Sequence, residues 1–342
     1  MIVNETRVLV TGGAGFIGSH LVERLSLDGH HVTVIDNLVS GRPSNLDAAN
    51  KSGLVDLHVH DVADHAAIRP LFQDVTRVIH LAGLADIVPS VESPLTYHRA
   101  NVDGTASVME AARLAGVQRV VYAASSSCYG VPDEYPTPES APMRPQYPYA
   151  LTKLLGEHIA LHWGSIYSMD VVSLRLFNVY GPRARTSGAY GAVFGVFLAQ
   201  KLAHETLTIV GDGDQTRDFT YVSDIVEAFV AASQRSAADV RGQAFNVGSG
   251  GTYSINSLAD MIGGPRVRIP ERPGEPHRTF ADISKIAAAL GWTPRVTFKH
   301  GVERVLDRIE DWRDAPVWTP ETIREATDPW FTNLGQAKVD AG

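Results

Sequence analysis

The sequence predicts an α/β protein in which a doubly wound parallel sheet is followed by a smaller, mixed α/β lobe. Over the first 180 residues, short β-branched runs alternate with helical stretches, which is the pattern of successive βαβ units. Most of these runs are apolar at nearly every position, as expected of strands that helices cover on both faces. We therefore expect a first domain over residues 1–180 and a second lobe over residues 181–330, with some chain returning to the sheet.

The expected elements follow in order along the chain. Residues 17–29 and 101–116 place apolar side chains at helical spacing and end on glycine, a common helix stop. Beyond residue 180, Pro and Gly become frequent, and shorter helices are expected over 223–234 and 254–263. The tail beyond about residue 312 is too irregular to assign. The runs that predict strands are residues 7–12, 31–37, 54–61, 77–83, 119–126 and 170–180.

Charge and hydropathy exclude two classes of partner. The chain has 342 residues, with 30 Lys+Arg against 38 Asp+Glu, and so a formal charge of −8. A negative chain without a basic block is not expected to bind duplex nucleic acid, because such binding depends on neutralising phosphates. No apolar stretch reaches the roughly 20 residues that span a bilayer, and the N-terminus lacks the layout of a signal peptide. We expect a cytoplasmic protein with no membrane partner.

The cysteine and histidine content gives no metal site. The single cysteine, Cys128, cannot form an intramolecular disulfide. A small strand-end residue is the favoured interpretation of Cys128, while a redox or nucleophilic role stays open. His58 and His60 point to one face of an expected strand, but no second group of His, Cys or carboxylate residues accompanies them. We therefore expect no bound metal.

The turn after the first expected strand carries a glycine pattern typical of nucleotide binding. Gly12, Gly15 and Gly18 allow a tight turn, the close approach of a pyrophosphate, and the packing of helix on strand. The helix N-terminus adds unpaired N–H groups and the positive end of its dipole. Asp36 ends the second expected strand, 18 residues past Gly18, near the spacing at which a carboxylate binds ribose hydroxyls. The pattern predicts a Rossmann-type dinucleotide site.

Asp36 also bears on which dinucleotide binds. Its carboxylate would repel a 2′-phosphate, which favours NAD over NADP, although Arg42 nearby could receive that phosphate. Asp61 ends the third expected strand and is either a partner of the adenine amino group or a plain turn residue. The remaining expected cofactor contacts are Phe16, Ile17, Asn37, Val62, Leu81, Ala82, Gly83 and Asn101.

Tyr149 and Lys153 are the candidate catalytic pair. They stand four residues apart, on one face of a helix that the preceding segment introduces. A phenol with a pKa near 10 is a poor base, and lowering that pKa by about three units takes roughly 4 kcal/mol of preferential stabilisation of the phenolate. A lysine one turn away, together with the positive end of a nicotinamide, can supply much of this energy. The pair is then a base for a hydroxyl group.

At the end of the fifth expected strand, the run AASSSCYG (123–130) completes a resemblance to a known family. Together with TGGAGFIGSH, YPYALTK, LRLFNVYGP, GDGDQTRDFTYVSD and FADISK, it resembles the extended short-chain dehydrogenases/reductases, and within them the nucleotide-sugar epimerases typified by UDP-glucose 4-epimerase. The resemblance covers nearly the whole chain. It implies that Ser125 shares a hydrogen bond with the 4-hydroxyl of the sugar, that Tyr149 is the base, and that Lys153 binds the nicotinamide ribose and tunes Tyr149.

The same resemblance implies a nucleotide-sugar substrate. Its diphosphate would be held by Asn178, Arg217 and Arg272, and guanidinium groups suit phosphate oxygens chemically. Thr279 stands where the family has a bulky aromatic residue, which should admit a 2-acetamido group. The serine run could instead bind a C6 carboxylate, so UDP-glucose/galactose, UDP-N-acetylhexosamines and UDP-uronic acids are all candidates. Further expected substrate contacts are Ser90, Ser126 and Ser127.

The implied reaction is epimerisation at C4 through a transient 4-keto sugar, with NAD regenerated in each turnover. Family members that remove water carry an acidic pair where this chain has Ser126 and Ser127, which argues against a dehydratase. A nucleotide-sugar dehydratase or decarboxylase remains the alternative, and a non-catalytic NAD-binding sensor is a further one. The apolar faces of residues 101–116 and 149–164 resemble the family's dimer interface, so we expect a homodimer.

Overall fold

The centre of the structure is a seven-stranded parallel sheet with the order β11-β6-β5-β4-β1-β2-β3. The computed structural model describes residues 7–184 and 192–334. The strand order reverses between β1 and β4, which creates the crevice where ligands bind in such sheets. The strands are β1 (Arg7–Thr11), β2 (His31–Asp36), β3 (Val55–Val59), β4 (Arg77–His80), β5 (Arg119–Ser125), β6 (Asp170–Leu176) and β11 (Gln243–Val247).

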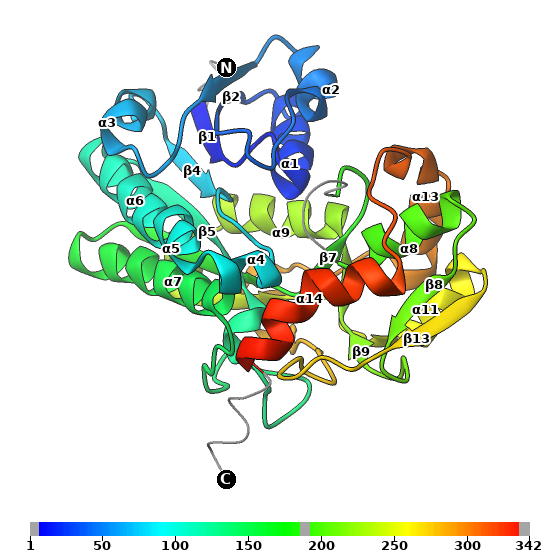
Figure 1. Ribbon diagram of the computed structural model, residues 1–342. Helices are drawn as coiled ribbons and strands as arrows, with labels where there is room; N and C mark the ends of the chain where they lie inside the picture. The colour runs from blue at the N-terminus through cyan, green and yellow to red at the C-terminus, as the bar shows by residue number, and fades with distance from the viewer. Residues whose placement is uncertain (1–6, 185–191, 335–342) are drawn as a thin grey trace.

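Helices cover both faces of this sheet, as the continuous apolar strands require (Figure 1). Successive side chains of a strand point to opposite faces, so Val8 and Val10 pack with one layer and Leu9 with the other. The first layer contains α1 (Phe16–Leu27) and α9 (Val222–Gln234). The second contains α6 (Gly104–Leu114) and α7 (Pro148–Ile166).

The second lobe has its own core. Tyr180, Phe194, Phe219 and Phe298 pack as a cluster of stacked and edge-to-face rings. The elements around this core are β7 (Asn178–Tyr180), α8 (Val193–Leu202), β8 (Leu207–Val210), β10 (Phe219–Tyr221), α11 (Ile255–Ile262), β13 (Arg266–Ile269), α13 (Phe298–Leu306) and α14 (Pro320–Leu334). The remaining α-helices and strands are α2 (Asp47–Asn50), α3 (His65–Ile68), α4 (Ile87–Glu92), α5 (Pro94–His98), β9 (Thr216–Arg217), α10 (Ala237–Val240), β12 (Tyr253–Ser254) and α12 (Ser284–Leu290).

Three elements differ from the sequence prediction. The strand expected over 170–180 divides, because Phe177 separates β6 from β7, and β7 leaves the large sheet to pair with β10. The helix expected over 101–116 starts as a wider π-helical turn at Arg99–Asp103 before α6 begins. The unassigned tail contains α14, a helix of 15 residues. The chain also returns to the large sheet through α9, β11 and α12.

The sequence predicts neither a membrane-spanning helix nor a metal site. Across residues 7–184 and 192–334, no helix combines the length and apolar character needed to cross a membrane. Over the same ranges, no group of three or more His, Cys, Asp or Glu side chains is arranged to hold a metal ion.

Candidate active site

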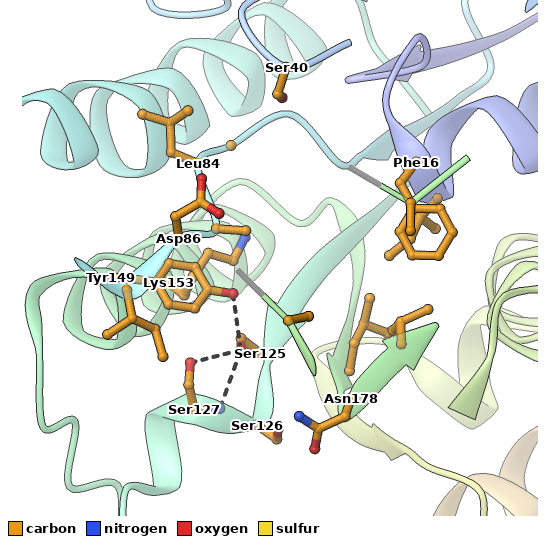
Figure 2. A pocket seen from close by; sticks show the side chains of 18 of the residues that line it. Phe16, Ser40, Leu84, Asp86, Ser125, Ser126, Ser127, Tyr149, Lys153 and Asn178 are labelled. Carbon is orange, nitrogen blue, oxygen red and sulfur yellow. Dashed lines mark hydrogen bonds between the residues drawn. The ribbon is translucent and has the colours of Figure 1, made fainter. Parts of the chain in front are cut away.

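A cavity of about 880 Å³ opens at the carboxyl ends of the sheet strands and extends to the second lobe. The glycine turn after β1 lines one end, and loops of the second lobe line the other. Figure 2 shows Ser125, Tyr149 and Lys153 close together among the residues that line the cavity. The cavity lies at the place that the reversal of strand order predicts for a ligand.

The glycine turn has the shape that a dinucleotide requires. Gly12 has φ +70°, and a Cβ there would lie 2.8 Å from the backbone nitrogen of Ala82. A Cβ on Gly18 would overlap the carbonyl oxygen of Gly12, so the helix can pack this closely only with glycine. A Cβ on Gly15 would meet only that same oxygen, at 3.1 Å, which leaves its other side open. Phe16 and Ile17 follow at the start of α1 and line the cavity with unpaired helix N–H groups. These residues fit a pyrophosphate.

Asp36 stands at the end of β2 and lines the cavity beside Asn37. Its carboxylate accepts hydrogen bonds from the backbone N–H groups of Ala14 (3.0 Å) and Leu38 (2.8 Å). Burial raises the pKa of Asp36, and these two hydrogen bonds oppose the rise. Asp36 therefore fixes the glycine turn against the end of β2, and its contact with an adenosine ribose remains a prediction.

Asp61 and Val62 also line the cavity. The Asp61 carboxylate accepts a hydrogen bond from the backbone of Ala63 (2.9 Å) and pairs with Arg99 (3.0 Å). Asp61 therefore stabilises the turn after β3, which is one of the two roles that the sequence suggested for it. A contact with adenine remains a prediction.

Leu81, Ala82 and Gly83 line the cavity as expected, but Asn101 does not. Asn101 is 1% exposed, and its side chain contacts the loop that contains Leu84 from inside the protein. Its Oδ1 accepts a hydrogen bond from the Leu84 N–H (2.8 Å), and its Nδ2 donates to the Leu84 carbonyl (3.0 Å) and to Thr152 Oγ1 (3.0 Å). Asn101 therefore ties the loop to α7, and its contact with the cofactor remains a prediction.

Tyr149, Ser125 and Ser127 form one hydrogen-bonded group (Figure 2). The Tyr149 hydroxyl donates to Ser125 Oγ at 3.3 Å, and the hydroxyls of Ser125 and Ser127 are 2.7 Å apart. Ser125 ends β5 and accepts a further hydrogen bond from the Ser127 N–H, which closes the turn after the strand. Lys153 follows Tyr149 by one helical turn of α7 and lies over the Tyr122 ring at 4.5 Å. The sequence-predicted trio is brought together.

The electrostatics of this group differ in one respect from the expectation. Burial raises the pKa of Tyr149, and the groups that oppose the rise are the hydroxyls of Ser125 and Ser127, whereas the charge of Asp86 adds to it. Sequence reasoning had credited Lys153 with favouring the phenolate. Burial lowers the pKa of Lys153 to about 8, with Glu157 opposing the change. The serines were expected to bind substrate, and their hydroxyls also oppose the rise in the pKa of Tyr149.

Ser90 is not among the residues that line the cavity. Its side chain is fully buried, donates to the carbonyl of Ile87 (2.6 Å) and accepts from the Tyr149 N–H (3.1 Å). It therefore satisfies a backbone donor in the first turn of α7. A contact between Ser90 and the substrate remains a prediction.

The residues expected to hold the substrate line the other end of the cavity. Arg217 donates to Glu275 at 2.6 Å, and Arg272 lies 3.6 Å from the same carboxylate. Burial would raise the pKa of Glu275, but Arg272 and Arg217 together hold it below its usual value. Thr279 Oγ1 donates to Asn178 Oδ1 (2.8 Å) and accepts from the Asp218 N–H (2.9 Å). Two guanidinium groups and one carboxylate leave a positive charge at this end.

The cavity-lining residues that sequence reasoning missed include Asp86, Tyr147, Trp318 and Trp330. Tyr147 belongs to the YPYALTK motif, and its position two residues before Tyr149 was the available signal. Asp86 closely follows Leu81, Ala82 and Gly83, which were expected to contact the cofactor. The two tryptophans lie in the tail, where no pattern identified a helix or a loop. Only the folded chain brings them to the site.

Cys128 lies beside the site but does not line the cavity. It is buried in a small cluster with Tyr129 and Leu154, and burial raises the pKa of its thiol to about 12. A thiol with such a pKa is protonated at neutral pH and a weak nucleophile. This favours the packing interpretation of Cys128.

Comparisons with known proteins agree with this site. The model of the NAD-dependent epimerase/dehydratase family matches residues 8–248. The UDP-glucose 4-epimerase of Mycolicibacterium smegmatis is 39% identical over 310 residues, which cover 88% of this chain and 97% of that protein. UDP-glucuronic acid decarboxylase 1 of Xenopus tropicalis is 33% identical over 89% of this chain and 72% of its own. The UDP-glucuronic acid 4-epimerase of Bacillus cereus, solved with UDP-glucuronic acid and NAD, superposes with a TM-score of 0.83 at 31% identity, over 89% of this chain and 99% of that one.

The glycine turn, the catalytic group and these matches lead to one assignment. The chain belongs to the NAD-dependent epimerase/dehydratase family, as a nucleotide-sugar epimerase-like member of the extended short-chain dehydrogenases/reductases that uses NAD as its cofactor.

Proposed function

We propose that the protein interconverts the C4 epimers of a UDP-sugar. One observation carries the proposal: the Tyr149 hydroxyl lies 3.3 Å from Ser125 Oγ, with Lys153 one helical turn away, in the same cavity as the glycine turn. Once it has lost its own proton, a tyrosine held in this way is suited, as the phenolate, to accept the proton of a sugar 4-hydroxyl. NAD, when bound, accepts and returns the hydride at C4.

The chain's own residues have separable tasks in this reaction. Tyr149 takes the proton from the 4-hydroxyl during oxidation and returns it during reduction. Ser125 binds the same oxygen and, with Ser127, stabilises the phenolate. Arg217 and Arg272 bind the diphosphate through charge-assisted hydrogen bonds, so that binding energy is concentrated away from the sugar. The sugar is then free to present either face to the cofactor.

Among the candidate sugars, Asp86 favours a neutral one. It lines the cavity near Tyr149 and Lys153, and its side chain does not cap α4 (Figure 2). A C6 carboxylate on a sugar bound at Tyr149 would lie close to this second carboxylate, and like charges repel strongly in a partly buried site. Thr279 lines the cavity with a small side chain, which leaves room for a 2-acetamido group. UDP-glucose/galactose and UDP-N-acetylhexosamines are therefore preferred to UDP-uronic acids.

A lyase is the second candidate, because UDP-glucuronic acid decarboxylase 1 is among the relatives. Dehydration needs an acid to protonate the leaving hydroxyl, and the two positions after Ser125 are Ser126 and Ser127. Decarboxylation needs a uronic acid, which Asp86 disfavours. Both observations support epimerisation over the lyase reactions.

A substrate panel tests the proposal. Purified protein is incubated with UDP-, CDP-, GDP- and dTDP-sugars, and the products are separated by chromatography and weighed by mass spectrometry. We expect a UDP-hexose or UDP-N-acetylhexosamine to yield its C4 epimer at unchanged mass. Loss of water or carbon dioxide would establish a lyase. No conversion of any nucleotide sugar by protein that holds NAD would support the sensor.

We also propose that the protein is a homodimer. Helices α6 and α7 pack side by side, and their ends expose Leu114, Leu151 and Ile166. Exposed apolar side chains on two adjacent helices favour an interface there. Light scattering after size-exclusion chromatography should give a mass near twice 37.0 kDa, and a mass of one chain would contradict this proposal.

A further inference from the structure

Helix α14 lies in the tail to which the sequence assigned no structure, and it reaches the candidate site. It lies across the molecule between α4 and the second lobe and packs against α4 (Figure 1). It also lies outside the stretch that the family model matches, so the shared motifs do not explain it. Ile323 and Trp330 anchor it, each with 2% of its surface exposed.

Trp330 is the residue of α14 that enters the substrate end of the cavity. Its indole Nε1 donates to the carbonyl of Pro273 at 2.7 Å, which fixes the ring against the loop that carries Arg272. The Arg272 guanidinium lies over the indole at 5.7 Å, and the Tyr147 ring lies 6.1 Å away at 50°. The indole is thus held on three sides by the chain.

These contacts join the two ends of the substrate site. A guanidinium that rests on an aromatic face has its orientation fixed, with its N–H groups directed outward in its own plane, the direction from which a guanidinium binds phosphate oxygens. On the other side, Tyr147 stacks on Tyr149 with 6.3 Å between ring centroids and 10° between planes. Trp330 therefore lies between the arginine assigned to the diphosphate and the tyrosine assigned to the sugar.

We propose that Trp330 is a substrate-positioning residue, which holds Arg272 in place for the diphosphate of the nucleotide sugar and, with Tyr147, forms the wall that confines the sugar. Helix α14 is then part of the binding site and not only a cover for the core. This inference rests on the proposed function, since it concerns how the same substrate is held.

The test compares Trp330→Ala, Trp330→Phe and the matched control Arg324→Ala, which changes an exposed residue of the same helix. For each protein, KM and kcat for the best UDP-sugar, the Kd of UDP, the Kd of NAD and the Tm are measured. Trp330→Ala should raise KM and the Kd of UDP about tenfold, with kcat within about threefold and the Kd of NAD within about twofold. Trp330→Phe keeps an aromatic face for Arg272 and should restore KM to within about threefold.

Each result decides the matter. A Trp330→Ala protein with an unchanged Tm and with KM and the UDP Kd within twofold of wild type would overturn the inference. Equal loss of NAD and UDP binding would also overturn it, since that indicates a general structural role. Should Trp330→Ala fold poorly, Trp330→Leu, which keeps apolar bulk without an aromatic face, should give the same rise in KM. If the wild-type protein binds UDP but converts no UDP-sugar, the epimerase proposal fails while the UDP measurements still decide the role of Trp330.

Discussion

Replacement of Tyr149 by Phe is the most direct test of the catalytic group. The change removes one oxygen atom, which donates to Ser125 Oγ at 3.3 Å, and keeps the ring that stacks on Tyr147. Ser125 retains its short contact with Ser127, so no hydroxyl of the group is left without a partner. The perturbation is therefore confined to the proton acceptor.

The expected effects on rate and stability differ greatly in size. General-base catalysis contributes about 10²- to 10⁴-fold, so kcat should fall by that factor, which corresponds to about 3 to 5.5 kcal/mol of activation free energy. The lost hydrogen bond is long and contributes at most about 1 kcal/mol to the free energy of unfolding. For a chain of this size, such a loss lowers Tm by about 3 °C or less.

Three measurements separate these effects. Epimer formation is followed by chromatography, bound NAD is quantified after release from the protein, and Tm is recorded. Tyr167→Phe serves as the control, because Tyr167 is an exposed phenol at the end of the same helix. The reasoning is refuted if Tyr149→Phe retains more than a tenth of the wild-type kcat with normal NAD content.

Three further substitutions probe the cofactor site, the sugar pocket and the pH dependence. Gly18→Ala places a Cβ against the Gly12 carbonyl, so the purified protein should lose its NAD and its Tm should fall by several degrees. Full NAD content would show that the backbone of the turn can shift to accept the Cβ. Thr279→Tyr should lower kcat/KM for UDP-N-acetylhexosamines at least about tenfold more than for UDP-hexoses, and an unchanged ratio would mean that this position does not border the acetamido group. Asp86→Asn removes a charge that raises the pKa of Tyr149, so the acidic limb of the rate profile should move to lower pH, and use of UDP-glucuronate should rise. A shift toward higher pH would contradict the sign of this interaction.

Much of the fold was predictable because its signals are local. The apolar runs, the glycine turn and Asp36 each depend on a few neighbouring residues, and the parallel sheet places their carboxyl ends at one edge. The break at Phe177 was not predictable, because β7 leaves the sheet only through its pairing with β10, some 40 residues later. A continuous apolar run does not show which residue ends the strand.

The candidate site divides in the same way. Ser125, Tyr149 and Lys153 lie in recognisable motifs, whereas the structural roles of Ser90 and Asn101 were not predictable. Both are polar residues near motifs, and their actual partners are the Tyr149 and Leu84 backbone groups, which lie 59 and 17 residues away. Burial decides such cases, since a buried polar group must find a partner inside the protein.

The sequence by itself determined the parallel α/β fold, the glycine turn and the candidate catalytic residues, because each arises from residue types at short, fixed spacings. Only the tertiary structure decided which groups surround these residues. The hydroxyls of Ser125 and Ser127 oppose the rise in the pKa of Tyr149, and the charge of Asp86 adds to that rise. Helix α14 places Trp330 against Arg272. These depend on contacts between distant segments, whose energies exist only after the chain has packed.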